Sequence, residues 1–340
     1  MATFGAPSGE PGKKSLWDIS DVNVAQGFVD ALVKHGHNRL DTARRYGNGQ
    51  SEEIISRLDL KGCIVDTKRV SHHTAAHDRH TDSTSCLHGI FPGAPDAPGN
   101  FKRENVLRLA DESIKALNGV PIDTFYLHAP DRSTPFEETL GAIDELYKQG
   151  VFKHFGPSNF YLWEVAEIVT ICRLKDYVQP TVYQGTYNVI DRVAEDELFP
   201  CLRRYSIRFA AYSPLAGGLL TGFSLDDPKL SENNFRFNPQ SGFLAARYIS
   251  RYGSSIDLLK RIRALGNEHE LTLTEIAVRW LVHHSKLHPD DLGIIYGGRK
   301  LERVESVLDN HAKGPLPDVI VQALDDGWKE IKGHVPSYSL

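Results

Sequence analysis

Four ionisable residues stand at or just after the ends of three short apolar segments of the chain. Asp41 ends the first segment, and Tyr46 follows it in a loop rich in Gly and Asn. Lys68 and His128 end the two other segments. A carboxylate, a phenol, an ammonium and an imidazole are the groups needed to protonate a carbonyl oxygen. These residues therefore indicate acid catalysis on a carbonyl group.

The phenol of a free tyrosine titrates near pH ~10, which makes it a weak acid catalyst at neutral pH. A neighbouring ammonium stabilises the phenolate, so we expect Lys68 to lower the pKa of Tyr46. Asp41 can pair with Lys68 and hold it in place, and His128 can hydrogen-bond the substrate oxygen or the phenol. Any one of these residues alone is more often structural. The interpretation depends on all four occurring together on neighbouring strands.

These strand ends need a scaffold that brings them to one place. The chain alternates short apolar runs, which predict strands, with amphipathic segments, which predict helices. We expect eight strands, at Thr3–Ala6, Arg39–Thr42, Cys63–Lys68, Thr124–His128, His154–Ser158, Thr181–Gln184, Arg208–Ser213 and Gly293–Tyr296. Besides a helix that starts near Glu52, we expect helices at Val22–His35, Asn105–Leu117, Phe136–Gln149, Leu162–Cys172, Ala194–Tyr205, Thr274–His284 and Leu301–Leu308.

Repeated strand–helix units without a break in composition predict one α/β domain over residues 1–340, a (β/α)8 TIM barrel. A doubly wound open sheet is the alternative. That fold would normally show a glycine-rich phosphate turn after the first strand, and Gly5–Gly9 does not fit it. Two long loops, about 70–100 and 214–253, should lie at the carboxyl face, where such barrels build their active sites. We interpret residues 314–340 as a C-terminal tail.

The composition limits the classes of partner. Among 340 residues 41% are hydrophobic, the formal net charge is −5, and both signs are interspersed. We therefore expect a globular protein that acts on a small molecule and has no nucleic-acid or membrane partner. Self-association into a homodimer stays open. The four cysteines, Cys63, Cys86, Cys172 and Cys201, form no CxxC pair, so we expect reduced thiols in a cytoplasmic protein.

A histidine-rich stretch follows Lys68. His73 and His77 are four residues apart, a spacing that can bind zinc on a helix, and His80 and His88 come after them. No cysteine–histidine pair of zinc-finger spacing accompanies them, and the segment resembles a loop. We therefore expect no metal site.

Several stretches of the chain resemble the aldo-keto reductase family, and within it the aflatoxin-aldehyde reductase branch. They are Leu40–Glu52, Phe125–Asp131, Ser158–Ile168, Pro180–Asn188, Leu198–Arg203 and Ala211–Gly222. The resemblance implies a (β/α)8 barrel that reduces an aldehyde or ketone to an alcohol with NADPH. It also implies a catalytic tetrad, which maps onto Asp41, Tyr46, Lys68 and His128.

The same resemblance implies where the cofactor binds. Ser158 and Asn159 match the pair that hydrogen-bonds the nicotinamide amide, with Gln184 beside them, and Tyr212 matches the aromatic residue that stacks on the nicotinamide ring. The segment after Tyr212 matches the loop that covers the pyrophosphate. Its glycines let backbone N–H groups approach phosphate oxygens. The expected contacts in this loop are Ser213, Pro214, Leu215, Gly217 and Gly218.

A second anion site should follow the last strand. Gly297 and Gly298 precede a predicted helix, and glycines before a helix N-terminus favour anion binding. Arg299, Lys300 and Arg303 add positive charge, which favours a 2′-phosphate and hence NADPH/NADP+ over NADH. The related branch usually has Ser-Ser and Gln at these three basic positions. Its Glu–Asn pair near adenine is replaced here by Ser306–Val307, so the resemblance provides no adenine contacts.

The substrate is less well defined. We interpret Phe160 as an apolar wall and Arg236 and Arg247 as candidates for binding a carboxylate, beside Tyr46 and His128 at the reacting carbonyl. Secondary metabolism and carbonyl detoxification are both compatible roles. Two other functions stay open: an NADPH-binding regulatory barrel resembling potassium-channel β-subunits with little turnover, and a Schiff-base aldolase that uses Lys68.

Overall fold

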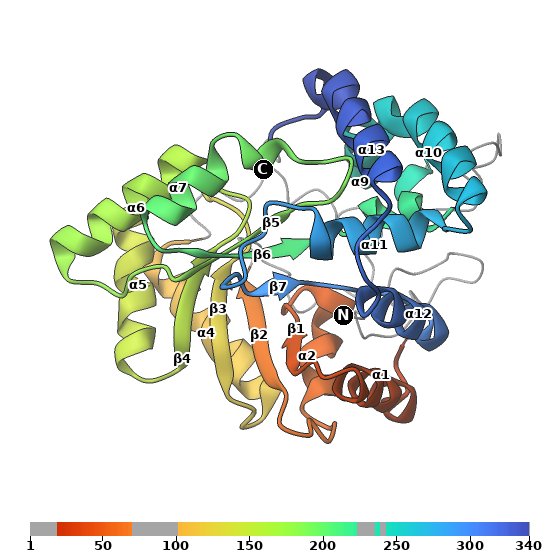
Figure 1. The fold of residues 1–340 in the computed structure, drawn as a ribbon. Helices are drawn as coiled ribbons and strands as arrows, with labels where there is room; N and C mark the ends of the chain where they lie inside the picture. The colour runs from red at the N-terminus through yellow and green to blue at the C-terminus, as the bar shows by residue number, and fades with distance from the viewer. Residues whose placement is uncertain (1–18, 70–100, 223–234, 239–242, 340) are drawn as a thin grey trace.

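A computed structural model describes residues 19–69, 101–222, 235–238 and 243–339. The predicted strand Thr3–Ala6 and the predicted insert about 70–100 lie outside these residues. Within them the chain forms seven strands (Figure 1). They are β1 (Arg39–Asp41), β2 (Ile64–Arg69), β3 (Ile122–Leu127), β4 (Phe152–Pro157), β5 (Val182–Thr186), β6 (Arg208–Tyr212) and β7 (Gly293–Ile294).

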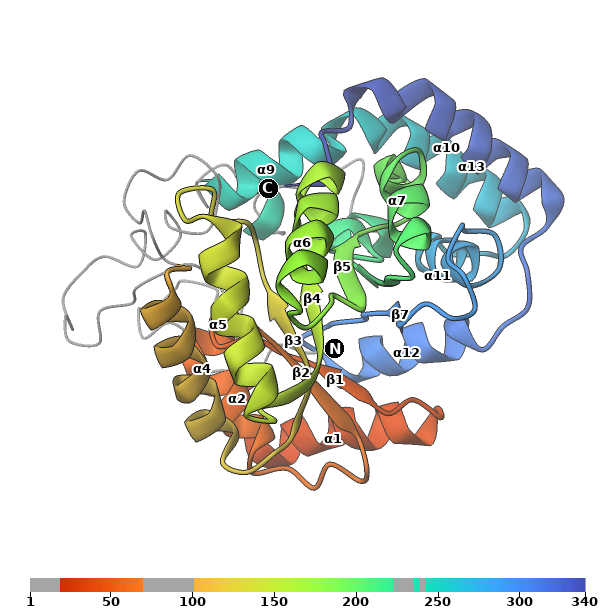
Figure 2. The ribbon, with the colours of Figure 1, turned by 90° about the vertical axis from the view of Figure 1, so that its left-hand side faces the viewer.

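All neighbouring strands run parallel. Strands β1 to β4 pair in chain order, and β5 to β7 pair in chain order as a second sheet. Parallel bridges from Phe155 to Pro180 and from Ser158 to Gln184 connect β4 with β5. The helices lie around the outside of the strands (Figures 1 and 2). The carboxyl ends of successive strands therefore face the same side of the molecule, as the predicted chemistry requires.

Helices connect the strands. The α-helices are α1 (Val22–Lys34), α2 (Gln50–Ile55), α4 (Arg103–Leu117), α5 (Phe136–Lys148), α6 (Leu162–Lys175), α7 (Leu198–Arg204), α9 (Phe243–Tyr252), α10 (Ile256–Glu268), α11 (Leu273–His283), α12 (Leu301–His311) and α13 (Asp318–Ile331). Short 3₁₀ turns are η1 (Tyr46–Gly49), η2 (Val193–Glu195), η3 (Ala216–Thr221), η4 (Phe235–Phe237), η6 (Gly253–Ser255) and η7 (Lys332–His334).

Three helices differ from the sequence prediction. Helix α9 lies inside the segment 214–253 that was predicted to be a loop, α13 lies inside the predicted tail 314–340, and α10 was not predicted. Helices α10 and α13 pack against each other closely, because a Cβ atom on Gly327 would lie only 2.2 Å from Leu258 Cδ1. Ile320, Leu324 and Ile331 are buried on α13 at helical spacing. The periodic signal for α13 was therefore present in the sequence and was missed.

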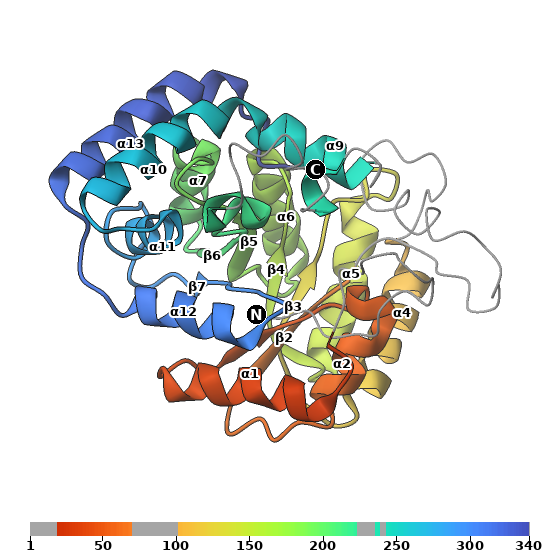
Figure 3. The same ribbon diagram turned by 90° about the vertical axis from the view of Figure 1, so that its right-hand side faces the viewer.

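The two ends of the described strand series lie side by side. Helix α12, which follows β7, packs on α1, which precedes β1 (Figure 3). A Cβ atom on Gly27 would lie 3.0 Å from Leu301 Cδ2, and His35 Nε2 lies 3.0 Å from Asp309 Oδ1. This contact brings the helix after the last strand against the helix before the first described one, as in a closed ring of strand–helix units.

Successive side chains of a strand point to opposite faces of the sheet, so the position of a residue in its strand determines whether it points inside the ring of strands. Phe125 stacks on Phe152 with ring centroids 5.4 Å apart. The next residue, Tyr126, points to the opposite side, and its ring centroid lies 5.7 Å from Lys68 Nζ. Thr67, beside Lys68, turns outward and donates to Glu52 Oε1 on α2 at 2.7 Å. The period of two in β2 therefore directs Lys68 to the inside, among the strand ends.

Candidate active site

A buried ion pair forms the base of the candidate site. Lys68 is completely buried, and its Nζ donates to Asp41 Oδ1 at 2.5 Å. Gln184 Nε2 donates to the same oxygen at 2.9 Å. A buried ammonium requires such a partner, because an uncompensated charge is very costly away from water. The predicted pairing of Asp41 with Lys68 is what the geometry shows, and three different strands, β1, β2 and β5, supply the side chains.

Tyr46 and His128 lie beside this ion pair. Lys68 Nζ is 5.4 Å from the centroid of the Tyr46 ring. The rings of Tyr46 and His128 meet edge to face, with centroids 6.0 Å apart. Nδ1 of His128 is buried without a hydrogen-bond partner in the part of the chain that the structure describes. The four predicted tetrad residues therefore lie together.

Glycine conformation sets the path of the loop that carries Tyr46. Gly49 has φ +94° and precedes the first turn of α2. A Cβ atom there would lie 2.7 Å from the guanidinium carbon of Arg44, whose Nη1 donates to the Gly49 carbonyl oxygen at 2.6 Å. Only glycine combines this backbone angle with such a close approach. The tight loop returns the chain to α2 directly after Tyr46.

The pKa directions differ from one of the sequence expectations. Burial, and next the negative charge of Asp41, raise the pKa of Tyr46 well above its ordinary value. The predicted lowering by Lys68 is therefore wrong as a net direction, because desolvation outweighs it. Burial, followed by the charge of Lys68, holds the pKa of His128 well below its ordinary value. At neutral pH the site combines a protonated phenol with a neutral imidazole.

The residues predicted to hold the nicotinamide adjoin the tetrad. Asn159 has the left-handed φ of +65°, and its Nδ2 donates to the His128 carbonyl oxygen at 2.8 Å and to Ser158 Oγ at 3.0 Å. The Tyr212 hydroxyl donates to Asn159 Oδ1 at 2.5 Å. Both amide hydrogens of Asn159 are thus used within the protein. A ligand amide could reach only the remaining acceptor capacity of its Oδ1.

The loop after Tyr212 has repeated left-handed backbone angles. Ser213, Ala216, Gly217 and Gly218 have φ values of +57°, +47°, +68° and +99°. Successive residues of this kind can turn backbone N–H groups toward one concave side, where they bind anions. A Cβ atom on Gly217 would lie 2.3 Å from Tyr248 Cε1, so the loop also needs glycine where α9 packs on it. Pro214 is buried within the loop and Leu215 is half-buried.

The second predicted anion site lies at the start of α12. Arg299, Lys300 and Arg303 are exposed there. Among the described residues no side chain caps the N-terminus of this helix, and the N–H groups of a first helical turn can bind an anion. Gly297 is exposed. Gly298 permits the turn into the helix, since a Cβ atom on it would lie 2.9 Å from Val304 Cγ2.

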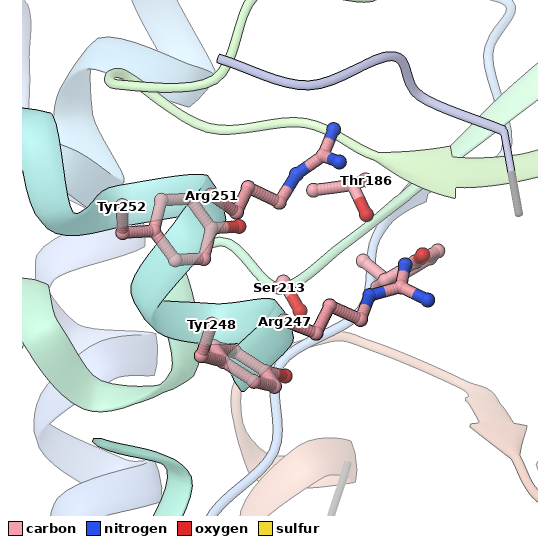
Figure 4. Close-up of a pocket in the computed structure, with 7 residues that line it drawn as sticks. Thr186, Ser213, Arg247, Tyr248, Arg251 and Tyr252 are labelled. Carbon is pink, nitrogen blue, oxygen red and sulfur yellow. The ribbon is translucent and has the colours of Figure 1, made fainter. Parts of the chain in front are cut away.

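A small cavity of about 20 Å³ lies next to Tyr212 (Figure 4). Helix α9 contributes most of its lining, as the labelled side chains show. The lining residues are Thr186, Tyr212, Ser213, Arg247, Tyr248, Arg251 and Tyr252. The charge of Arg247 contributes to lowering the pKa of His128, and Tyr248 contributes to raising that of Tyr46. Helix α9 therefore borders the tetrad.

Sequence reasoning had identified Arg247 but not the rest of this helix. Arg247 and Arg251, like Tyr248 and Tyr252, are four residues apart and so share a face of α9. The repeated Arg-Tyr pairs were the available signal. They were missed because the whole segment was expected to be a loop.

Two residues that were predicted to contact the substrate, Phe160 and Arg236, do not line the pocket beside Tyr212. Phe160 is completely buried, packs on Phe136 with ring centroids 5.9 Å apart, and accepts a hydrogen bond at its carbonyl oxygen from the Tyr183 hydroxyl. Its side chain belongs to the core, so it does not fit the role of a substrate wall. The Arg236 guanidinium lies 5.8 Å from the Tyr248 ring centroid, and its Cδ approaches Gly217. Arg236 thus covers the loop after Tyr212.

Other predictions concern metals, thiols and membranes. His73, His77, His80 and His88 lie outside the described residues, as does Cys86. Among the residues that the structure describes, no group of three or more His, Cys, Asp or Glu could hold a metal ion. Cys63, Cys172 and Cys201 are free thiols. Within the same ranges, no helix has the length and apolar character needed to cross a membrane.

Comparisons with known proteins agree with this geometry. A sequence model of the aldo/keto reductase family matches residues 11–329. An aldo-keto reductase of Pseudocercospora fijiensis is 38% identical over 92% of this chain and 99% of its own length. The aldo-keto reductase pigE of Monascus ruber is 34% identical over 97% and 94%. Human aflatoxin B1 aldehyde reductase member 2 is 37% identical over 94% of this chain and 85% of its own.

Proposed function

Because the chain belongs to the aldo/keto reductase family, we propose that it reduces an aldehyde with NADPH and that Tyr46 donates the proton. Family membership confirms the predicted (β/α)8 barrel, the predicted oxidoreductase class and its action on carbonyl groups. Members of the family use a nicotinamide cofactor. The choice of NADPH, the roles of the individual residues and the substrate class belong to the proposal.

The observation that carries the proposal is the cluster around Lys68. A completely buried ammonium, held by Asp41 at 2.5 Å, lies 5.4 Å from the ring of a tyrosine. A purely structural ion pair would not need a phenol and an orphaned imidazole nitrogen beside it. In a barrel, residues at the carboxyl ends of strands form the active site.

Each residue has a role that follows from its state. Tyr46 stays protonated, because burial raises its pKa, and it donates its proton as negative charge grows on the carbonyl oxygen. The Lys68 ammonium then stabilises the phenolate that remains. Neutral His128 donates a ring N–H to the carbonyl oxygen. When bound, NADPH supplies the hydride.

The chain's own residues fit that cofactor in three places. Tyr212, Ser158 and Gln184 lie around the tetrad and would hold the nicotinamide, together with the remaining acceptor site on Asn159. The left-handed loop Ser213–Gly218 would hold the pyrophosphate, with Leu215 and Pro214 shaping it. Arg299, Lys300 and Arg303 would hold the 2′-phosphate at the N-terminus of α12. This last group supports NADPH over NADH.

The substrate class is inferred from the pocket and the relatives. Relatives from human, mouse and rat are aflatoxin B1 aldehyde reductases, which supports an aldehyde. Arg247 borders the pocket and lies close enough to His128 to affect its pKa, so it would bind a carboxylate on the same small molecule. A Schiff-base aldolase is disfavoured, because Lys68 is completely buried and held as an ammonium by Asp41.

A panel of aldehydes and ketones, followed by NADPH absorbance and repeated with NADH, tests the proposal. We expect carbonyl-dependent oxidation of NADPH and a clear preference for NADPH. Arg303→Ala should raise KM for NADPH by about 2- to 5-fold, the effect of one exposed ion pair, and leave KM for NADH unchanged. Equal use of the two cofactors by the wild type would contradict the 2′-phosphate site.

A further inference from the structure

The C-terminal segment Ser337–Ser339 returns to the site. It follows α13 and η7 and runs to the space between α6 and α9 (Figure 2). Ser339 Oγ donates to the Asn159 carbonyl oxygen at 2.8 Å and accepts from Arg132 Nη2 at 3.3 Å. Asn159 has a left-handed backbone angle, which few residues other than glycine adopt although asparagine tolerates it best. A hydrogen bond to its carbonyl oxygen therefore helps to hold it in that conformation.

The segment is docked by its middle residue. Tyr338 is 6% exposed, its hydroxyl accepts from the Leu162 N–H at 3.1 Å, and its ring meets that of Tyr161 edge to face. This contact satisfies an N–H group at the start of α6, which would otherwise lack a partner within the helix. Ser337 and Ser339 on either side are therefore held at fixed places.

The other end of the segment is tied to α9. Arg251 Nη1 donates to the Ser337 carbonyl oxygen at 2.8 Å. The same guanidinium binds both carboxylate oxygens of Asp191, Nε to Oδ2 at 2.5 Å and Nη2 to Oδ1 at 3.2 Å, and both residues are buried. A bidentate buried pair fixes direction as well as distance. The segment is thus anchored to α9, which lines the pocket.

The connections continue to Ser213, the residue after Tyr212. Asp191 and Asn188 exchange backbone hydrogen bonds, at 3.2 and 3.0 Å, across a tight turn. Asn188 Nδ2 donates to the Ser213 carbonyl oxygen at 2.9 Å. The Tyr212 hydroxyl itself donates to Asn159 Oδ1. The C-terminal segment is therefore linked by hydrogen bonds to Asn159, which binds the Tyr212 hydroxyl, and through Arg251, Asp191 and Asn188 to Ser213, which follows Tyr212 in the chain.

We propose that the segment Ser337–Ser339 is a clasp that positions Asn159 and Tyr212, and through them the nicotinamide end of the cofactor. Ser339 is the positioning residue, acting through the Asn159 backbone rather than on the ligand. The inference rests on the proposed function, since it presumes that the nicotinamide binds at Tyr212. The clasp contacts Asn159, α6 and α9, whereas the basic residues lie at the start of α12, so we expect it to act on the nicotinamide end of the cofactor only.

A pair of matched variants tests this inference. Ser339→Ala removes the hydroxyl that binds Asn159. Ser337→Ala is the control, because the Ser337 side chain is exposed and, within the described part of the chain, accepts only a long hydrogen bond, 3.4 Å from the Ser339 N–H. Ser339→Thr keeps the hydroxyl. The dissociation constants for NADPH and for adenosine 2′,5′-bisphosphate, which lacks the nicotinamide, are measured by calorimetry, with Tm as a check on folding.

We expect Ser339→Ala to raise Kd for NADPH by about 2- to 10-fold, the effect of one hydrogen bond, and to leave Kd for the bisphosphate unchanged. Ser337→Ala should change neither, and Ser339→Thr should restore NADPH binding. If Ser339→Ala raised Kd equally for both ligands, the structure would be loosened in general and the clasp would be overturned. The clasp would also be overturned if Ser339→Ala had the same Kd for NADPH as Ser337→Ala.

Failure of the proposed function gives a different result. If the wild type bound NADPH tightly but no carbonyl compound led to its oxidation, the proposed reductase activity would be refuted. The pattern of dissociation constants would still decide whether the clasp exists. A wild type that binds neither ligand would overturn both.

Discussion

The proposed site has one group of cations at each end, and the two groups differ in exposure. Lys68 is completely buried and fixed to Asp41 at 2.5 Å. Arg299, Lys300 and Arg303 are exposed at the start of α12. A charge in the interior acts strongly over a short distance and has a fixed position, whereas exposed charges are weakened by water and salt. The buried end is therefore suited to chemistry and the exposed end to reversible capture of an anion.

The difference predicts how each region responds to change. Changes at the buried end should affect turnover and stability, because the groups there are held without water. Changes at the exposed end should affect cofactor affinity and its dependence on salt. A variant that affects both turnover and cofactor affinity strongly would contradict this division.

Tyr46→Phe should reduce kcat by about 10²–10⁴-fold, the usual contribution of a positioned general acid. The Kd for NADPH should stay near the wild-type value, because the ring remains and only the hydroxyl is lost. Rapid-mixing kinetics with saturating cofactor would measure the first quantity and fluorescence titration the second. Tyr248→Phe, which removes a phenol hydroxyl from the neighbouring pocket beside Tyr212, is the matched control and should cost much less. Similar losses in the two variants would remove Tyr46 from its role.

Asp41→Asn should lower the free energy of unfolding by about 3–5 kcal/mol, because it leaves the buried Lys68 ammonium without its counter-charge. Urea unfolding measures the change. Asp309→Asn provides a control at an exposed ion pair, where the carboxylate contacts His35 and is 68% exposed. That variant should cost less than about 1 kcal/mol. Comparable losses at both sites would mean that burial of Lys68 does not control its energetics.

The tetrad could be predicted from the sequence because its geometry follows from the strands. Asp41, Lys68 and His128 come at or near the carboxyl ends of parallel strands, and such ends meet in any barrel. The pKa direction of Tyr46 could not be predicted, since it depends on how much water the packed structure excludes, including at α9. The sign of the net shift is a property of packing rather than of the neighbouring charge alone.

The surroundings of the cofactor site were harder to predict. Ser339 contacts Asn159 across 180 residues, and Arg251 contacts Asp191 across 60. No local pattern marks such contacts, because serine and arginine in a tail or a loop are ordinarily solvated. Phe160 differs from the prediction in the other direction. This aromatic residue beside a binding motif was expected to line the pocket, whereas its side chain is buried in the core.

Salt should distinguish the two ends more gently. Raising the ionic strength from about 0.1 M to about 1 M shortens the screening distance from about 10 Å to about 3 Å. Three exposed ion pairs of about 0.2–1 kcal/mol each would then be lost, so KM for NADPH should rise by about 3-fold or more. The kcat at saturating cofactor should hardly change, because the Asp41–Lys68 pair is shielded from ions. A salt-sensitive kcat with an unchanged KM would reverse the assignment of the two regions.

The smallest effect concerns the electric field at His128. Burial and the charge of Lys68 hold its pKa well below the ordinary value, with a further contribution from Arg247. The ring therefore stays neutral as pH falls through ~6.5, and its proton NMR signals, assigned with His128→Gln, should not titrate there. Arg247→Gln removes one of the opposing charges and should move the titration to higher pH. Arg303→Gln, the same substitution at the exposed end, should leave it in place. If both variants moved it equally, the field of the exposed cations would reach the catalytic ring, and the two regions would not be electrostatically separate.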